Sequence, residues 1–379
     1  MRQVSVKGIG MTRFGKHEGS IKKLAVEASR QALKDAGYPK VDAIYVGNFM
    51  GGSLAGQEIL GSMLANELGL GPVPAAKVEG ACASGGIAFR QAYHLIASGV
   101  YERVLVVGVE KMTHGSIEQI TGAINTAMDN DSNEGLAGLT FPGFFGVVAN
   151  RYFHETGASK EHLARVALKN RTYALENPLA QFRKPTSLEE ILAARAITDP
   201  LGLFDCSPVT DGAAAMLLEA GGEGVRVLAS GQASGPPLMQ EIPDLLRIPA
   251  IGEAARQAYE QAGLGPDDVD VVEVHDCFSM TELITVEELG FAEKGQGWVA
   301  LEEGCFSPGG KVPVNTSGGL LSRGHPIGAT GLAQIYQVVS QLRGTACNQV
   351  EGARIGLAQN LGGTGAYSTV HIFEGGKTS

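Results

Sequence analysis

Four segments of the sequence carry side chains capable of covalent or acid–base chemistry. The first is KVEGACASGGIAF, where Cys82 stands between a short strand pattern and a long helix pattern. A thiol at a helix start lies at the positive end of the helix dipole, which is expected to lower its pKa and make it a better nucleophile. A small buried residue in a tight turn gives the same local pattern, so Cys82 is a candidate nucleophile at this point.

The second and third segments carry histidines. NTSGGLLSRGHPIGATG (315–331) places His325 before a proline at a helix start, where proline is tolerated and fixes the backbone. His325 is therefore a candidate general base or oxyanion donor, with a structural role as the alternative. VDVVEVHDCFSMTELI (269–284) predicts a strand ending at Val274 and then His275 and Cys277, whose spacing of two directs both side chains to the same space.

The fourth segment, GLAQNLGGTGAY (356–367), predicts a strand that runs into a glycine loop. It lacks the lysine and the following helix of a phosphate-binding loop, so its backbone N–H groups are instead candidates for stabilising an oxyanion. Zinc is the rival for the whole set, because Cys82, His275, Cys277 and His325 are all possible ligands. The absence of a CxxC pair and of an HExxH motif argues against that metal site.

An internal repeat supplies the elements that must position these residues. Residues 25–37 (AVEASRQALKDAG) resemble 251–263 (IGEAARQAYEQAG), with Glu27 and Glu253 separated by 226 residues. Both copies predict an amphipathic helix closed by glycine and followed by a strand. Because 85–99 and 330–344 form a second similar pair of helices, we expect a duplicated α/β fold with strands and helices alternating. All four chemical segments then fall at strand ends or helix starts, the edge where such sheets bind ligands.

An insertion interrupts the first half at about 116–195 and is expected to form a cap. We predict an apolar loop at 138–148, a helix at 159–177, a loop at 177–185 and a second helix in SLEEILAAR (187–195). The predicted domains are 1–225 and 226–379, joined at GGEGVRV (221–227).

Composition limits the class of protein. The 379 residues are 44% hydrophobic and 18% charged, with a net charge of −10, which argues against a nucleic-acid partner. We find no apolar run of ~20 residues and no secretory signal, so we expect no membrane association. Five cysteines without paired spacing fit the reducing cytoplasm, and the low charged fraction favours an oligomer interface.

With these segments in hand, the chain resembles the thiolase superfamily over essentially its whole length. GHPIGATG (324–331) matches the thiolase GHP motif and GACASGG (80–86) the nucleophile CxS motif. HDCF (275–278), NPLAQFRKP and DPLGLFDCSPVTDGAAA look like the sterol-carrier-protein-type and archaeal branch. The resemblance implies a duplicated five-layer αβαβα fold, which explains the repeat.

Two departures from the family pattern move expected roles. The most-studied thiolases have NEAF in place of HDCF, and a second catalytic cysteine in a CxG motif where this chain has Asn360. The resemblance therefore implies that Cys277 is the acid/base cysteine and that His275 takes the oxyanion role of the NEAF asparagine. Gly362 would keep the backbone role of the CxG glycine.

The implied activity is thiolytic cleavage of a 3-oxoacyl-CoA, or the reverse Claisen condensation, by an acyltransferase of the acetyl-CoA C-acyltransferase type. The expected catalytic residues are Cys82, His325, Cys277 and His275, with an oxyanion hole from the backbone of Cys82 and Gly362 and from both histidines. CoA is a substrate, and no metal or tightly bound cofactor is expected. Arg183 and Lys184 are candidate CoA phosphate contacts, with a solvated basic pair as the alternative. Phe141, Phe144 and Phe145 are candidates for the acyl pocket, with cap core as the alternative.

Two other functions stay open from the sequence. A decarboxylating ketoacyl synthase would use Cys82, His275 and His325 without Cys277. A non-catalytic CoA-binding or assembly subunit is the other, since members of this branch work with a small DUF35-type protein, an OB-fold with a zinc ribbon. We therefore expect acyl-CoA substrates, a homodimer or larger oligomer, and a DUF35-type partner as one candidate. The acyl chain is left open among acetoacetyl, medium-chain, branched and aromatic groups.

Overall fold

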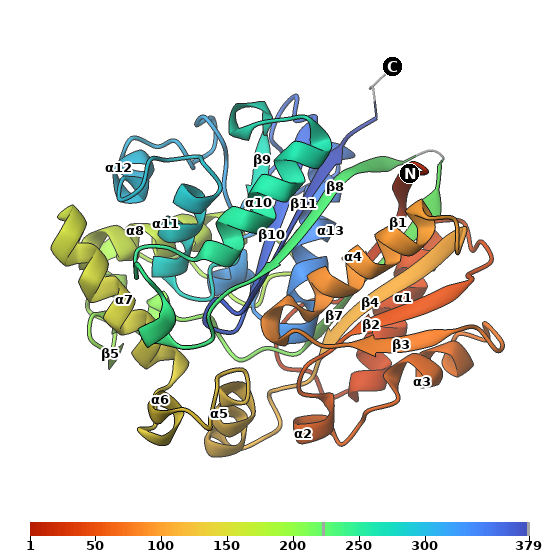
Figure 1. Cartoon of the computed structure of the whole chain (residues 1–379), viewed down its shortest axis with the longest axis horizontal. Coiled ribbons are helices and arrows are strands. Elements are labelled where there is room, and N and C mark those ends of the chain that lie inside the picture. The colour runs from red at the N-terminus through yellow and green to blue at the C-terminus, as the bar shows by residue number, and fades with distance from the viewer. Residues whose placement is uncertain (222–223, 377–379) are drawn as a thin grey trace.

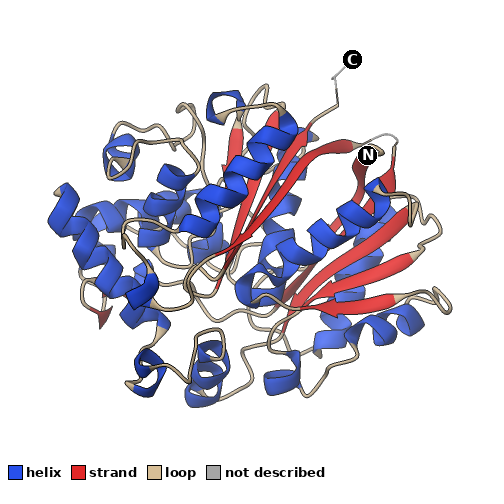
Figure 2. Ribbon diagram, in the orientation of Figure 1, coloured by secondary structure: helices blue, strands red, loops and turns tan. Residues whose placement is uncertain are grey.

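The computed structural model describes residues 1–221 and 224–376 and places its main strands in one sheet (Figures 1 and 2). The strand order is β3-β2-β4-β7-β1-β8-β11-β10-β9. Their bounds are β1 Val4–Met11, β2 Ala43–Gly47, β3 Ala75–Val78, β4 Arg103–Glu110, β7 Gly212–Ala220, β8 Val225–Ser234, β9 Val271–Glu273, β10 Ile355–Gly362 and β11 Tyr367–Glu374. A separate small hairpin is formed by β5 (Ala196–Thr198) and β6 (Leu201–Gly202).

The two halves of this sheet repeat one pattern, so the predicted duplication is confirmed. In the first half β2 pairs in parallel with β3 and β4, and β7 pairs antiparallel with β4 and β1. In the second half β9 pairs in parallel with β10, and β11 pairs antiparallel with β10 and β8. The halves meet where β1 pairs with β8 over Ser5↔Arg226 and Val6↔Val225.

Helices cover both outer faces of the halves and fill the layer between them. On the outside, α1 (Ile21–Asp35) packs on β1 and β7, and α10 (Pro249–Ala262) packs on β8 and β11. In the middle, α4 (Ser84–Ala97) and α13 (Thr330–Leu342) pack against each other and against both halves. The result is the expected five-layer αβαβα arrangement, and the two central helices begin at the predicted chemical segments.

The cap of the first half is helical, and one prediction for it is wrong. Residues 138–148 were expected to form a loop, but α7 spans Phe141–Thr156. The Thr140 hydroxyl caps this helix by accepting the Gly143 N–H at 3.3 Å, and Pro142 lies in the first turn, where its missing N–H needs no partner. The helices expected at 159–177 and after Ser187 are confirmed as α8 (Lys160–Ala174) and α9 (Leu188–Leu192).

The remaining helices are short or peripheral. They are α2 Gly51–Ala55, α3 Leu60–Glu67, α5 Ile117–Asn125, α6 Asn133–Leu136, α11 Ser279–Glu288 and α12 Gly297–Glu302. In the predicted junction at 221–227, residues 222–223 lie outside the described residues, and β8 begins at Val225. The described ranges contain no helix with the length and apolar character needed to cross a membrane.

Candidate active site

A tight turn between β3 and α4 places Cys82 at the start of a central helix. The chain takes a positive φ of 50° at Ala81 and then forms the short 3₁₀ turn Ala81–Ala83 (η1). The Ser84 hydroxyl ties the turn by accepting the Gly80 N–H at 3.0 Å and donating to the Ala81 carbonyl at 2.6 Å. A non-glycine residue in the left-handed region costs roughly 1–2 kcal/mol, so the turn holds Cys82 in a position that an ordinary loop would not adopt.

Cys82 opens into a cavity of about 290 Å³ that three of the other predicted residues also line. Cys277 and His325 line the same space, and so does Phe141 from the cap. The rest of the lining comes from Met112, Thr121, Ile124, Asn125, Thr140, Pro142, Ile197, Cys206, Ser207, Pro208, Val209, Phe278, Ile327 and Gly363. Segments from both halves and from the cap therefore converge on one mostly apolar pocket.

The electrostatics of the thiol differ from the expectation. Burial raises the pKa of Cys82 to about 12, although the Gly363 backbone N–H that hydrogen-bonds its sulfur acts in the opposite direction. The expected lowering by the helix start is therefore wrong, because removal from water outweighs it. Burial also raises the pKa of Cys277, and the neighbouring Cys82 raises it further. Both thiols are neutral at pH 7, so attack requires a base that removes the proton as the bond forms.

The hydrogen bonds of His325 leave one of its ring nitrogens able to accept a proton. Its Nδ1 lies 2.7 Å from the Thr330 hydroxyl oxygen, and that hydroxyl donates its single proton to the Pro326 carbonyl at 3.1 Å. Nδ1 must therefore carry a proton and donate to Thr330, which leaves Nε2 with a free lone pair. Burial lowers the pKa of His325 to about 3, with a smaller contribution from the positive charge of Arg323, so the ring is neutral and able to accept a proton.

His275 follows β9 and lies edge-on to His325, with ring centroids 5.0 Å apart at 86°. Burial lowers the pKa of His275 well below its usual value, and His325 and Arg323 lower it further. Among the described residues, Cys82, His275 and His325 each offer one potential ligand atom, and these three atoms lie within 4.8 Å of one another. The structure places these three predicted residues together, and three such ligands also equal the number of protein ligands in a catalytic zinc site. Cys277 is not part of this group.

Cys277 enters the cavity from the start of α11. Its sulfur lies 3.8 Å from the Thr281 hydroxyl, and its backbone carbonyl accepts the Ser207 N–H at 2.9 Å. The adjacent Phe278 ring packs on Phe145 with centroids 4.8 Å apart. Ser207 and the cap residue Phe145 thus hold the HDCF segment beside the cavity.

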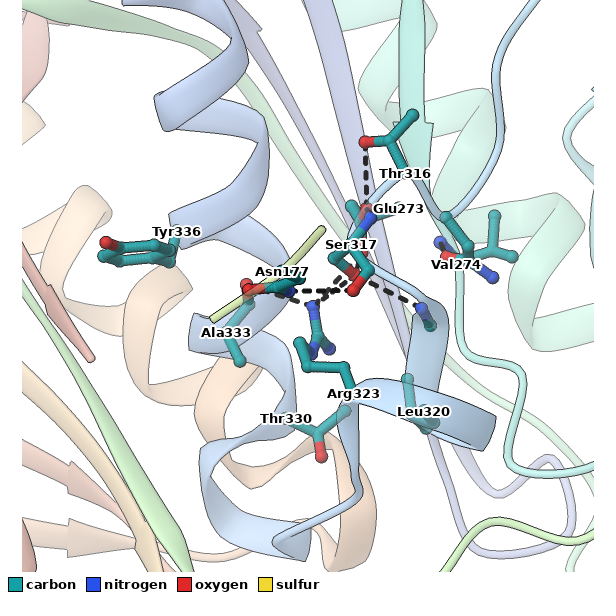
Figure 3. A network of polar contacts seen from close by, with 12 residues as sticks. Asn177, Glu273, Val274, Thr316, Ser317, Leu320, Arg323, Thr330, Ala333 and Tyr336 are labelled. Atoms are coloured by element: carbon teal, nitrogen blue, oxygen red, sulfur yellow. Dashed lines mark hydrogen bonds and ion pairs between the residues drawn. The ribbon is translucent and has the colours of Figure 1, made fainter. Parts of the chain in front are cut away.

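A buried ion pair links the segments that carry the two histidines (Figure 3). Glu273 at the end of β9 is two residues before His275, and Arg323 is two residues before His325. Arg323 Nη1 lies 3.1 Å from Glu273 Oε2, and the exposed fractions of the two side chains are 0% and 1%. The Ser317 hydroxyl donates to Glu273 at 2.6 Å and accepts from Arg323 at 3.0 Å. The pair therefore connects the segment that carries His275 to the segment that carries His325.

A second buried carboxyl holds the loop after His325. Glu110, the last residue of β4, accepts the backbone N–H of Gly328 at 3.0 Å and those of Phe49 and Met50 at 3.1 Å. Asn48 donates to it at 2.9 Å. Burial raises the pKa of Glu110 to about 7, although these donors favour its charged form. The position of Glu110 at the carboxyl end of a buried strand was the signal that could have identified it from sequence.

The remaining predicted residues are placed unequally around the cavity. Gly362 is the last residue of β10, and the adjacent Gly363 lines the cavity. Phe144 and Phe145 are buried in the hydrophobic core with the cap and the second half. Arg183 is exposed and donates to the Leu175 carbonyl at 3.2 Å, and Lys184 is exposed beside it.

Sequence comparison agrees with the duplicated fold in both halves. Residues 4–221 match the family "Thiolase, N-terminal domain", and residues 231–375 match "Thiolase C-terminal domain-like". A duplicated α/β fold with a buried cysteine and two histidines at its centre, matched over both halves, defines the class: the chain belongs to the thiolase family.

Individual relatives narrow this placement. The chain is 45% identical to the acetyl-CoA acetyltransferase of Methanothermobacter thermautotrophicus, over 98% of this chain and 100% of the relative. It is 38% identical to human sterol carrier protein 2, over 97% of this chain and 71% of the relative. The chain is accordingly a thiolase, an acyltransferase with CoA as a substrate, and the synthase and non-catalytic alternatives are not favoured.

Solved structures agree with the fold. The structure described as "Ltp2-ChsH2(DUF35) aldolase" aligns with a TM-score of 0.85 at 28% identity, over 99% of this chain and 98% of that chain. Human mitochondrial 3-ketoacyl-CoA thiolase in complex with CoA aligns with a TM-score of 0.76 at 18% identity, over 99% of this chain and 98% of that chain.

Proposed function

We propose that this thiolase cleaves a 3-oxoacyl-CoA, or runs the reverse condensation, through an acyl group on Cys82. The observation that carries the proposal is the convergence of Cys82, His325 and Cys277 on one cavity, with His275 against His325. Each of the four residues can then be given one step.

In the first step, His325 Nε2 takes the Cys82 proton while the sulfur attacks the keto carbon of the substrate. The bond between C2 and C3 breaks, and its electron pair moves to the thioester half as an enolate. The backbone N–H groups of Cys82 and Gly362 hold the tetrahedral oxyanion. His275 and the newly protonated His325 donate to the enolate oxygen.

In the second step, the Cys277 thiol protonates C2 and releases acetyl-CoA. The shortened acyl-CoA forms only afterwards, when CoA takes the acyl group from Cys82. The resulting Cys277 thiolate takes the proton from an incoming CoA thiol, and the CoA sulfur attacks acyl-Cys82. The Cys82 sulfur leaves and recovers its proton from His325, so both cysteines and both histidines return to their initial state. Two thiols are needed because one is occupied as the thioester while the other moves the proton.

The cavity favours an uncharged acyl group. No lysine, arginine, aspartate or glutamate is among the described residues that line it, so a carboxylate on the acyl chain would lose its hydration without gaining a partner. Phe141, Ile197 and Val209 line the space that an apolar chain would fill. Arg183 and Lys184 remain our candidates for the CoA phosphates.

Partners and location belong to the same proposal. The exposed residues Ala75 and Ala76 on edge strand β3 and the low charged fraction support a homodimer or larger oligomer. The similarity to the DUF35-containing aldolase structure supports a small DUF35-type partner. All five cysteines are unpaired, which fits the cytoplasm.

A panel of 3-oxoacyl-CoA substrates tests the proposal. Acetoacetyl, medium-chain, branched, aromatic and carboxylated substrates are assayed with free CoA, with and without a co-expressed DUF35-type protein. Thiolysis of uncharged substrates is expected, with the carboxylated one at least about tenfold slower. The absence of CoA-dependent cleavage in every arm would overturn the activity, and preference for the carboxylated substrate would overturn the substrate class.

A further inference from the structure

Asn360 is a buried residue that the steps above do not use. It lies in β10, at the position where the resemblance places the second catalytic cysteine of other thiolases. Its side-chain nitrogen Nδ2 lies 3.0 Å from the Cys82 carbonyl oxygen and 3.0 Å from His275 Nδ1. One amide therefore contacts both the nucleophile segment and the HDCF histidine.

The orientation of this amide follows from its partners. A backbone carbonyl can only accept a hydrogen bond, so the side chain must direct its N–H₂ group, and not its oxygen, at Cys82. The opposite orientation would place two carbonyl oxygens face to face. The two N–H bonds are then both used, one for the Cys82 carbonyl and one for His275.

Glycines on both central helices make room for the Asn360 side chain. A Cβ at Gly331 on α13 would lie 2.3 Å from Asn360 Oδ1, and one at Gly86 on α4 would lie 3.1 Å from it. Glycine at both positions lets the amide fit between the helices. The side chain is 2% exposed, so solvent does not compete for its hydrogen bonds.

The state of His275 follows directly. Because Asn360 donates to Nδ1, that nitrogen must accept and carries no proton. The neutral ring then has its proton on Nε2. This is the reverse of His325, whose Nδ1 donates to Thr330 and whose Nε2 has the free lone pair. The two histidines thus present opposite hydrogen-bonding character.

We infer that Asn360 is a positioning residue that holds His275 in the Nε2–H form, so that His275 donates to the enolate oxygen while His325 serves as base. The inference rests on the proposed role of His275 at that oxygen. An Nε2 lone pair would repel the developing negative charge, whereas an N–H stabilises it. Acyl transfer to Cys82 uses the backbone N–H groups and does not need this tautomer.

Histidine ¹⁵N NMR of the intact protein tests the tautomer without any activity measurement. The chain has eight histidines, and the His275 signal is identified by its loss in His275→Gln. In the wild type at neutral pH, His275 is expected to have a protonated Nε2 and an unprotonated Nδ1. A protonated Nδ1 in the wild type overturns the inference, and this arm requires no altered protein to fold.

Asn360→Asp tests the consequence, because a carboxylate accepts where the amide donates. The proton of His275 should move to Nδ1. Deuterium exchange at C2 of acetyl-CoA should fall about 10²–10³-fold, the usual cost of one oxyanion donor. Acyl transfer to Cys82 should fall less, by the effect of losing the hydrogen bond to the Cys82 carbonyl. The control is Asn177→Asp, which also buries a carboxylate but whose side chain bonds Ser317 and Leu179. It should leave the proton of His275 on Nε2, because Asn177 does not hydrogen-bond His275.

The outcomes distinguish the role of Asn360 in setting the tautomer from the role of His275 at the enolate oxygen. An unchanged tautomer in Asn360→Asp overturns the role of Asn360. A reversed tautomer with normal C2 exchange shows that Asn360 sets the proton position but that His275 does not hold the enolate oxygen, which overturns that part of the proposed function. Equal loss of both half-reactions overturns the assignment to the enolate step.

Discussion

Removing one partner of the Glu273–Arg323 pair should strongly destabilise the protein. Glu273→Gln keeps the shape of the side chain and removes its charge. The Arg323 guanidinium then remains at 0% exposure without its counter-charge, since Glu273 is its ion-pair partner at 3.1 Å. Ser317 also lies against both side chains (Figure 3), but its hydroxyl cannot neutralise a cation.

The magnitude follows from this burial. Breaking a fully buried ion pair by removing one partner costs about 3–5 kcal/mol, because the other charge is left desolvated. Surface pairs cost about 0–1 kcal/mol. Glu273→Gln and Arg323→Met should each lower the free energy of unfolding by the amount typical of a buried pair, about 3–5 kcal/mol. The double variant should cost no more than either single variant, because no unpaired charge remains.

Urea unfolding of the wild type, the two single variants and the double variant measures the coupling between Glu273 and Arg323 as a double-mutant cycle. The matched control is the Arg103–Glu219 pair, which joins β4 to β7 at 2.6 Å with side chains 35% and 18% exposed. Glu219→Gln should cost less than about 1 kcal/mol. The thiolysis kcat of Glu273→Gln should also fall, because the segments carrying His275 and His325 lose their link.

Two results would refute the reasoning. If Glu273→Gln costs no more than Glu219→Gln, the buried pair does not hold the segments. If the two single costs simply add in the double variant, Glu273 and Arg323 act independently.

Three further results are expected together. Burial lowers the pKa of His371 to about 3, whereas an unfolded histidine titrates near ~6.5. Below pH ~6.5 the unfolded state therefore binds a proton that the folded state does not, and the free energy of unfolding decreases. Between about pH 7.5 and 5, urea unfolding should show that His371→Gln loses about 2 kcal/mol less of this free energy than the wild type does. Equal losses would contradict the neutral buried ring. Replacing Arg183 and Lys184 by glutamine should raise KM for CoA about tenfold with kcat unchanged, and an unchanged KM would remove the pair from the CoA site. Treatment with a chelator should leave kcat unchanged, and elemental analysis should find less than one zinc per chain. If the protein contains one zinc per chain and loses it together with activity, Cys82, His275 and His325 form a zinc site.

The position of the site could be predicted from sequence because its parts follow strands. Cys82 and His275 come after β3 and β9, and His325 precedes α13, so the repeat places all three at the centre of the fold. The duplication itself was visible because both copies of the outer helix keep their closing glycine, with φ of 78° at Gly37 and 67° at Gly263.

Features that depend on distant packing could not be predicted in the same way. The sequence predicts a loop over the start of α7, where Pro142, Gly143 and Gly146 are all poor helix formers. Gly146 is instead needed for packing, since a Cβ there would lie 2.9 Å from the Asp199 carbonyl. The helix start at Cys82 was visible locally, while the burial that raises its pKa comes from both halves. Glu273 and Arg323 are 50 residues apart and give no sequence signal of pairing.

The central claim is that Cys82 carries the acyl group while Cys277 moves the proton, and Cys277→Ser tests both parts. Because His325 activates Cys82, the variant should still form an acyl adduct that mass spectrometry maps to the Cys82 peptide. A serine hydroxyl titrates far above a thiol, so C2 deuterium exchange of acetyl-CoA should fall about 10²–10⁴-fold. Normal C2 exchange and thiolysis in Cys277→Ser, or an adduct on Cys277 in the wild type, would contradict the account.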